Sequence, residues 1–246
     1  NDGITPGLRV LTKMEYSPAG HLIKVMKKTG NSPEVTIAQN TYDELGRLMN
    51  KKIGLVRNAS NQNSYTASPL DSLTYSYNIR GWLRGINKDY ARNENGAVNW
   101  FGMELCYDFG FTNAYLNGNI AGARWRSRGD DAQRAYGFTY DAVNRLTNAN
   151  FTQQSQSTKT WNTSDGIDFS STFNYDANGN ILSMNQKGLV VNQSKQIDSL
   201  VYGYFLNTNR LKYVTDLAND TSLHLGDFTE INNNTTQDYW YDGNGN

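Results

Sequence analysis

Few residues in this chain have the types and spacing that catalysis requires. The only histidines are His21 and His224, and Cys106 is the only cysteine. A nucleophilic cysteine or serine needs a base, usually histidine, within hydrogen-bond reach. Cys106 lies in an apolar, strand-like run, where a free cysteine usually packs in the core. We therefore expect a buried Cys106, no catalytic triad and no enzymatic activity.

Two runs imitate the start of a calcium-binding loop. Residues 176–180 and 242–246 both read Asp-x-Asn-x-Asn. An EF-hand loop also needs Gly at its sixth position and Glu at its twelfth, and the first run has Ile181 and Lys187 there. Asp and Asn at this spacing are also turn residues. We therefore expect turns, with no metal site and no cofactor.

One local run has the composition of a ligand contact. In Arg124, Trp125 and Arg126, the indole could stack a sugar ring while the arginines hold an acidic polymer. The same alternation in a strand would place both arginines on one face and pack Trp125 on the other. We favour packing and keep ligand contact as the alternative. The other tryptophans are likewise expected to be buried in or beside strands: Trp82, Trp100, Trp161 and Trp240.

Composition narrows the class of protein. The 246 residues include 23 Lys+Arg and 23 Asp+Glu, and this zero net charge argues against a nucleic-acid partner. No run of 18 apolar residues is present to span a membrane, and the start lacks the pattern of a signal peptide. The chain has 32 Asn, 22 Gly and 16 Tyr. This composition predicts many short strands joined by many tight turns.

A degenerate motif, Tyr-Asp-x-x-Gly-Arg/Asn-Leu/Ile, recurs along the whole chain. Copies begin at Tyr16, Tyr42, Tyr77, Tyr140, Tyr175, Tyr204 (with one extra residue) and Tyr241. A shortened copy runs from Tyr115 to Ile120. The residues that define the best copies are Tyr42, Asp43, Gly46 and Arg47; Tyr77 and Gly81; Tyr140, Asp141 and Asn144; and Tyr175, Asp176 and Gly179. A repeat at this spacing indicates an array of similar supersecondary units.

Each motif position predicts one part of a β-hairpin. Before the Tyr (position 0), aromatic and aliphatic residues alternate with small or polar ones, as in a half-buried strand. Asp at +1 can hydrogen-bond the backbone two residues on. Position +4 needs a positive φ and is Gly, Asn144 or, in the offset copy, Asn209. The aliphatic residue at +6 restarts a strand, so Tyr and Leu or Ile can face one core.

These repeated motifs resemble the YD-repeat (Rhs-repeat) family, and the resemblance covers nearly the whole chain. It implies hairpins that wind into a long spiralling sheet, a hollow shell. Bacterial members enclose a C-terminal toxin, and the animal teneurins act in cell adhesion. Carbohydrate binding is a function often ascribed to the repeats. Two features of the toxin members are missing here: the Rhs-associated core with its aspartate self-cleavage site, and the toxin domain. The sequence also ends inside a motif, so we expect a fragment of a longer chain.

The expected molecule is all-β, with successive antiparallel hairpins in a curved, partly spiralled sheet that forms a partial shell. We expect one domain over residues 1–246 and a secreted or cell-surface bacterial location. The expected function is a non-enzymatic scaffold that encloses a cargo or toxin; the alternative is a carbohydrate-binding or adhesion module. Expected partners are the rest of the longer chain and glycans. Because open sheet edges invite pairing, an edge-to-edge homodimer is also expected.

Overall fold

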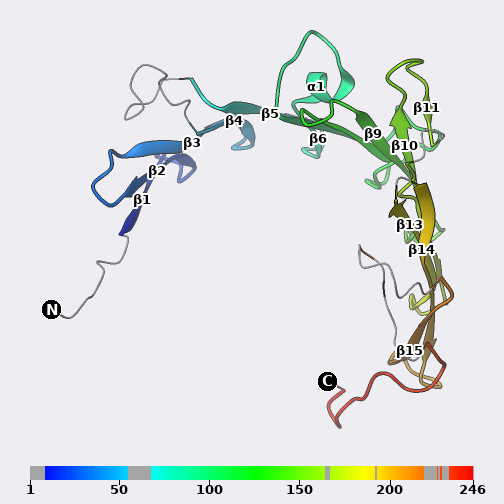
Figure 1. Ribbon diagram of the computed structural model, residues 1–246. Helices are drawn as coiled ribbons and strands as arrows, with labels where there is room; N and C mark the ends of the chain where they lie inside the picture. The colour runs from blue at the N-terminus through cyan, green and yellow to red at the C-terminus, as the bar shows by residue number, and fades with distance from the viewer. Residues whose placement is uncertain are drawn as a thin grey trace. The chain divides into compact units, whose positions relative to one another are not determined.

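The computed structural model describes residues 9–54, 68–163, 167–191, 193–218, 226, 228 and 233–245. In these ranges the chain forms fifteen β-strands and one helix of five residues (Figure 1). The predicted all-β class is therefore confirmed. Within the same ranges, no helix has the length and apolar character needed to cross a membrane.

The chain divides into two compact units. The first contains residues Asn1–Glu104 and Trp125–Asp131, and the second contains Leu105–Arg124 and Ala132–Asn246. Elements of the first unit are β1 (Val10–Tyr16), β2 (Leu22–Thr29), β3 (Val35–Tyr42), β4 (Leu48–Ile53), β5 (Asp71–Tyr77), β6 (Leu83–Ile86), α1 (Lys88–Arg92) and most of β7 (Phe101–Cys106). The prediction of one domain over the whole chain stays a prediction.

The second unit holds the remaining strands. They are β9 (Gln133–Tyr140), β10 (Leu146–Gln154), β11 (Trp161–Asn162), β12 (Ser171–Tyr175), β13 (Ile181–Val190), β14 (Gln193–Tyr204) and β15 (Leu211–Asp216). Strand β8 (Gly122–Ser127) contributes residues to both units.

The order of strands in the sheet follows the sequence from β1 to β15, except that β11 pairs only with β10. Every pairing with a defined register is antiparallel. Each strand pair joined by a motif turn is a hairpin: β1–β2, β3–β4, β5–β6, β9–β10, β12–β13 and β14–β15. The predicted array of antiparallel hairpins is thus confirmed.

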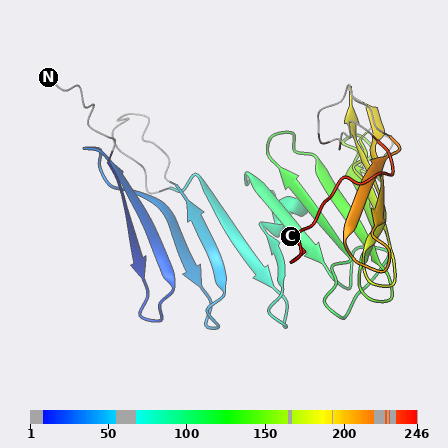
Figure 2. The same cartoon turned by 90° about the horizontal axis from the view of Figure 1, so that it is seen from below.

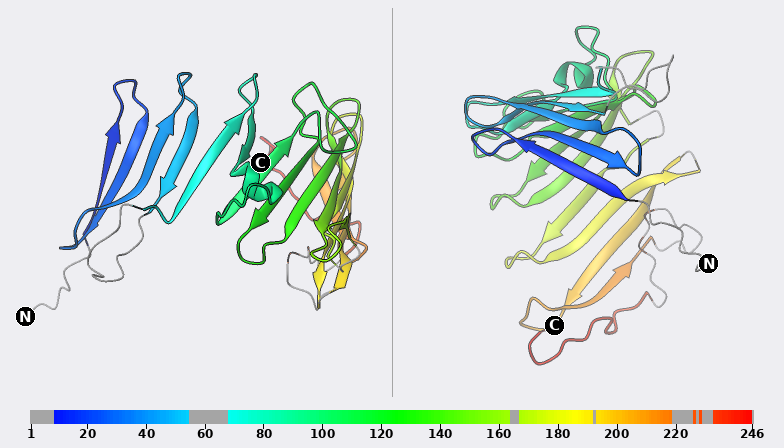
Figure 3. Two further views of the ribbon diagram at one scale, coloured as in Figure 1. Left: turned by 90° about the horizontal axis from the view of Figure 1, so that it is seen from above. Right: turned by 90° about the vertical axis from the view of Figure 1, so that its left-hand side faces the viewer.

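In each unit, the motif turns lie on one side of the sheet, at the ends of the strands. In the first unit, the turns after β1, β3 and β5 are side by side at the lower edge in Figure 2. In the second unit, the green-to-orange hairpins likewise end on one side in Figure 3, right. The repeats therefore stack their turns in register within each unit.

Each unit has its own small core. In the first unit, Glu104 is fully buried and forms an ion pair with Arg92 of α1, beside the buried Tyr90 and Ala91. A buried carboxylate is tolerated when such a partner neutralises it.

In the second unit, Phe151 is buried between the rings of Tyr136 and Phe169, at centroid distances of 5.4 and 5.2 Å. Cys106 is a free thiol with no exposed surface. The prediction that this cysteine is packed in the core is confirmed.

The prediction that the tryptophans are buried is wrong at three positions. Trp100, Trp161 and Trp240 are 58%, 38% and 73% exposed. A large ring on a strand is buried only where other groups cover that face of the sheet, so ring size alone does not determine burial. One face of the Trp100 ring is covered by a side chain: the Arg128 guanidinium lies 4.9 Å from the ring centroid.

Candidate functional site: a repeated tyrosine turn

Where the residue at +1 is Asp, its side chain organises the turn. In the β9–β10 hairpin, Asp141 Oδ1 accepts the backbone N–H groups of Val143 and Arg145 at 3.0 and 2.9 Å. Asp43 and Asp176 accept the corresponding pairs of N–H groups at 2.8–3.0 Å. One carboxylate oxygen thereby satisfies two donors that the turn would leave unpaired. Asp43, Asp141 and Asp176 therefore have the turn-forming role predicted for them.

An amide can replace the carboxylate in this role. Asn78 occupies the same position, and its Oδ1 accepts the N–H groups of Arg80 and Trp82, both at 2.9 Å. What the turn requires at +1 is therefore a short side chain with an oxygen acceptor, rather than a negative charge.

The left-handed backbone position is also where the motif predicts it. Gly46, Gly81 and Gly179 have φ of 77°, 81° and 91°, and Asn144 has φ of 66°. Residues with a Cβ rarely adopt these angles, and Gly and Asn tolerate them best. The substitution of Asn144 for Gly thus follows the sterics of the backbone.

The prediction for the offset copy is wrong. Asn207, with φ of 58°, has the left-handed conformation that we assigned to Asn209. The extra residue lengthens this loop, which is closed by the N–H of Phe205 donating to the carbonyl of Arg210 at 2.9 Å. In this longer loop, the left-handed residue comes two positions earlier in the sequence than the motif predicts. The N–H of Arg210 donates to Thr208 Oγ1 at 3.1 Å.

The acidic residues of the turns have lowered pKa values. The backbone N–H of Arg145 is the main cause of the lowered pKa of Asp141, helped by the Arg145 side chain, whose Nε lies 2.6 Å from Asp141 Oδ2. The Asn180 amide, 2.8 Å from Asp176 Oδ2, lowers the pKa of Asp176 in the same way. Hydrogen bonds to a carboxylate favour its charged form.

The motif tyrosines join each hairpin to the preceding one. The hydroxyl of Tyr42 donates to the carbonyl of Leu22, the +6 residue of the preceding copy, at 2.8 Å. The same contact to a +6 carbonyl recurs at 2.8–2.9 Å between Tyr77 and Leu48, Tyr175 and Leu146, and Tyr204 and Ile181. In the irregular copies, Tyr140 bonds the carbonyl of Ile120 at 3.0 Å and Tyr241 bonds that of Leu211 at 2.9 Å. Burial raises the pKa of Tyr140, Tyr175 and Tyr204. These three tyrosines are therefore neutral donors, and all six connect one repeat to the next.

The residue at +5 covers the ring of the next tyrosine. Arg47 lies 5.0 Å from the ring centroid of Tyr77, and Arg145 lies 4.8 Å from that of Tyr175. The imidazole of His21 stacks on Tyr42 in the same place, with 4.8 Å between ring centroids. Cation–π and stacking contacts of this kind attract the two groups beyond simple burial. These three junctions thus have both a hydrogen bond and a ring contact.

The strand register between hairpins is also constant. At four junctions the residue at +8 of one copy lies opposite the residue at −3 of the next: Lys24 and Gln39, Asn50 and Thr74, Asn148 and Thr172, and Ser183 and Val201. On the face opposite the tyrosines, polar side chains at these strand positions bond across strands. Asn50 Nδ2 donates to Ser72 Oγ at 3.0 Å, and Asn148 Nδ2 donates to Thr139 Oγ1 at 2.7 Å.

These contacts between hairpins do not follow from a single motif. Its spacing predicts that Tyr and the +6 residue of one hairpin face a common core, whereas the Tyr hydroxyl bonds the +6 carbonyl of the hairpin before it. A signal was available in the basic or aromatic residues at +5, namely His21, Arg47, Trp82 and Arg145. They suit contact with a neighbouring ring better than a solvated turn.

The arginine-rich run of β8 is engaged in packing. The Arg126 guanidinium lies 4.6 Å from the centroid of the Tyr90 ring, 3.3 Å from Asp131 Oδ1 and 2.9 Å from Asn93 Oδ1. Burial, and next the hydrogen bond to Asp131, raises the pKa of Tyr90 to about 12. Trp125 is half-buried. The geometry of Arg126 and Trp125 fits the packing interpretation, and ligand contact by Arg124, Trp125 and Arg126 stays a prediction.

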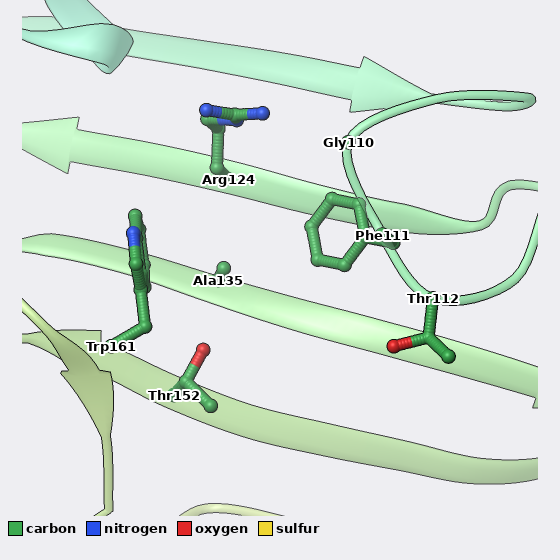
Figure 4. A pocket seen from close by; sticks show the side chains of 7 residues that line it. All are labelled: Gly110, Phe111, Thr112, Arg124, Ala135, Thr152 and Trp161. Carbon is green, nitrogen blue, oxygen red and sulfur yellow. The ribbon is translucent and has the colours of Figure 1, made fainter.

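A pocket of about 510 Å³ opens on the sheet of the second unit, and Arg124 lines it. The rings of Trp161 and Phe111 stand on either side of Ala135, while Arg124 and Thr152 close the other two sides (Figure 4). The Phe111 ring rests on Gly122, where an added Cβ would lie 2.4 Å from it. The absence of a side chain at Gly122 therefore positions one wall of the pocket.

The remaining sequence candidates for chemistry lie in turns or outside the described residues. His21 is stacked on Tyr42, and His224 lies outside the described residues. Asp176, the first residue of the calcium-like run, uses its oxygens on Asn178 and Asn180. Within the described ranges, no group of three or more His, Cys, Asp or Glu residues could hold a metal ion.

No protein-family model and no curated protein matches the sequence. Among solved structures, the chain is similar to TcdB2-TccC3-Cdc42, with 12% identity and a TM-score of 0.30 over 84% of this chain. It is also similar to TcdB2-TccC3 (11%, 0.28, 79% of this chain) and to TcdB2-TccC3 without the hypervariable C-terminal region (13%, 0.33, 84%). The chain spans 12% of the length of each of these chains. At these values the likeness assigns neither a family nor a function.

Proposed function

We propose that the chain is a non-enzymatic scaffold segment of a bacterial secreted or cell-surface protein of the YD-repeat kind. Its hairpins build part of a β-shell around a cargo or toxin in the same longer chain. The observation that supports this proposal is the repeated junction between hairpins. Six tyrosine hydroxyls each bond a carbonyl of the preceding repeat, which belongs to the +6 residue in four cases and to Ile120 or Leu211 of an irregular copy in the other two. The +5 side chains cover several of these rings.

The polar side chains of the motif are engaged in contacts within a hairpin and between neighbouring hairpins. The carboxylate of Asp141 holds two N–H groups and Arg145, and Arg145 also donates to the carbonyl of Asp176 at 2.7 Å. Groups held in this way are poorly suited to proton transfer or nucleophilic attack. They are well suited to making one hairpin bind the next in a fixed register, which is what a wall of repeated units needs.

The scaffold proposal is tested on the protein as its native cells make it. Intact mass and a C-terminal peptide map should show an unrelated domain beyond residue 246, found in the secreted or surface fraction. Limited proteolysis should leave that domain uncut until the shell is unfolded with urea, whereas the same domain expressed alone should be cut at once. A native chain with no further domain, or a cargo that is cut as fast inside the chain as outside it, would contradict the proposal.

A second function, carbohydrate binding, is favoured by the pocket of the second unit. Its two aromatic walls can stack against the apolar face of a sugar ring, and Arg124, Thr112 and Thr152 offer polar contacts at the rim. The lining includes one cation and no carboxylate, so an acidic saccharide is the preferred ligand class.

The pocket is tested by isothermal titration with a hyaluronan tetrasaccharide as the acidic probe and chitotetraose as the neutral one. Trp161→Ala should weaken binding of the acidic probe roughly tenfold, or about 1.4 kcal/mol. Trp240→Ala is the matched control, because Trp240 is exposed and is not part of the lining. Absence of binding by both probes, or equal losses in the two variants, would exclude this site.

A further inference from the structure

A second, smaller pocket adjoins the larger pocket of about 510 Å³ in the second unit. It has a volume of about 210 Å³, and the two pockets share Phe111, Thr112 and Thr152 in their linings. Ligand pockets usually measure roughly 300–1,000 Å³, so the smaller pocket suits a ligand better as an extension of its neighbour than alone. The two pockets therefore form one elongated site.

The strand register explains the shape of this site. Ala135, Gly137 and Thr139 alternate along β9 and therefore lie on the same face of the sheet, where they line the pockets. Thr152 and Asn150 of β10 lie directly opposite Ala135 and Gly137. The small residues of β9 thus form a low floor, and β10 supplies a polar wall beside it.

Two glycines make room for the ring that both pockets share. An added Cβ would lie 2.4 Å from the Phe111 ring at Gly122 and 3.4 Å from it at Gly137. The ring therefore rests on the backbone of β8 and β9. Because this ring lines both pockets, it can contact two consecutive rings of one bound chain.

The polar groups of the two pockets differ in charge. Arg124 lines the larger pocket, whereas the lining of the smaller pocket contains no charged residue. The smaller pocket has instead the carboxamides of Asn113 and Asn150 and the hydroxyls of Thr112 and Thr139. An acidic sugar therefore fits the larger pocket, and a neutral sugar fits the smaller one.

Asn150 is the polar group best placed to select a ligand. Its side chain is exposed, and its carboxamide makes no hydrogen bond to another described residue. Asn148, on the same face of β10, instead donates to Thr139 Oγ1 at 2.7 Å. Gly137, which lies opposite Asn150, has no side chain that could serve as such a partner. The Asn150 carboxamide thus keeps both its donors and its acceptor for a ligand.

We infer that the two pockets together bind a glycan in which an acidic sugar alternates with an N-acetylated amino sugar. This inference rests on the proposed saccharide site and adds the second sugar with its acetamido group. The acidic ring lies in the larger pocket, with its carboxylate on Arg124. The next ring lies in the smaller pocket, where its acetamido group both donates to and accepts from the Asn150 carboxamide.

An acidic polypeptide is a poorer occupant of the same site. An extended peptide that binds a sheet through its backbone adds to a free strand edge. Strands β9 and β10 each have a neighbouring strand on both sides, so neither offers such an edge. Sugar rings bind by stacking on aromatic side chains, and for this the exposed face of the sheet is sufficient.

Four probes test this inference by isothermal titration with the intact chain. Hyaluronan tetrasaccharide has both the acid and the acetamido group, tetragalacturonate has only the acid, and chitotetraose has only the acetamido group. Tetraglutamate represents the acidic polypeptide. Hyaluronan tetrasaccharide should bind roughly tenfold more tightly than each of the others, because only this probe makes both polar contacts.

Asn150→Ala identifies the acetamido contact. It should weaken binding of the hyaluronan probe roughly tenfold and leave that of tetragalacturonate unchanged. Because Asn150 is exposed and its carboxamide bonds no described residue, the melting temperature should not change. Asn174→Ala is the matched control, since Asn174 is also an exposed strand residue of the second unit and lines neither pocket. It should leave the affinity for hyaluronan unchanged.

The outcomes separate this inference from the site on which it rests. If Trp161→Ala weakens binding of both acidic saccharides but Asn150→Ala weakens neither, the inference is overturned and the saccharide site is retained. Binding of none of the saccharides would overturn both. Equal affinities for hyaluronan and tetragalacturonate, or tighter binding of tetraglutamate, would also overturn the inference.

Discussion

At the scale of single residues, the tyrosine hydroxyl joins one hairpin to the next. Tyr175→Phe removes only the hydrogen bond to the Leu146 carbonyl, which is 2.8 Å long, and keeps the ring under Arg145. We expect a loss of about 0.5–1.5 kcal/mol in the free energy of unfolding, measured by urea denaturation. Tyr16→Phe is the control and should lose less, since Tyr16 bonds no carbonyl. Equal losses in the two variants would show that the carbonyl contact contributes little.

The need for a glycine at +4 can be tested by adding a single methyl group. At Gly81, φ is 81° and an added Cβ would meet no atom within 4 Å, so Gly81→Ala introduces backbone strain without a clash. We expect a loss of about 1–2 kcal/mol, measured by thermal unfolding. Gly129 also has open space around an added Cβ but no positive φ. Gly129→Ala should therefore leave the melting temperature nearly unchanged, and a similar drop in both variants would point to another cause.

At the scale of the element, the hairpin turn couples stability to pH. The pKa of Asp141 is lowered in the folded chain, mainly by the Arg145 backbone N–H. A lowered folded pKa means that the stabilisation is complete above the unfolded value of about 3.9 and is lost as pH falls through the folded value. Asp176 behaves in the same way. We therefore expect stability to decrease on acidification below about pH 4.

Asp141→Asn separates the charge from the hydrogen bonds of this turn. Asn78 shows that an amide oxygen at +1 can accept both N–H groups. The variant should keep its fold at pH 7 and lose less stability than the parent between about pH 4 and pH 2, measured by urea denaturation at each pH. An identical pH profile for parent and variant would contradict the assignment. Asp141→Ala, which removes the acceptor as well, should be destabilised at every pH.

At the scale of the whole molecule, the division into two compact units predicts how the chain unfolds. Cys106 lies in the second unit and is fully buried, so its reaction with a thiol reagent reports the opening of that unit. Tyr77 and its partner Leu48 lie in the first unit, whereas Tyr175 and Leu146 lie in the second. If the units open independently, Tyr175→Phe should speed labelling roughly fivefold and Tyr77→Phe should leave it unchanged. If both variants speed labelling, the chain opens as the single domain that the sequence predicts.

The local features of the repeat follow from the sequence alone. A left-handed residue at +4 and an acceptor at +1 are decided within seven residues of chain, by steric limits on φ and by the reach of a short side chain. This is why the positions of Gly46, Gly179 and Asn144 are predicted correctly from the motif. The same local logic gives the alternation of each strand, and so the all-β class. It fails at Asn209, where one inserted residue changes the loop and moves the left-handed position to Asn207.

Only the tertiary structure decides what lies between the hairpins. The partners Tyr175 and Leu146 are 29 residues apart, and Arg145 and Tyr175 meet only because the strands pair with +8 opposite −3. The pocket brings together Phe111, Arg124 and Trp161 from a loop and two strands. The exposure of Trp100, Trp161 and Trp240 likewise depends on which side chains cover each strand. A motif fixes the shape of one hairpin because its forces act locally, whereas contacts between hairpins exist only after distant strands have paired.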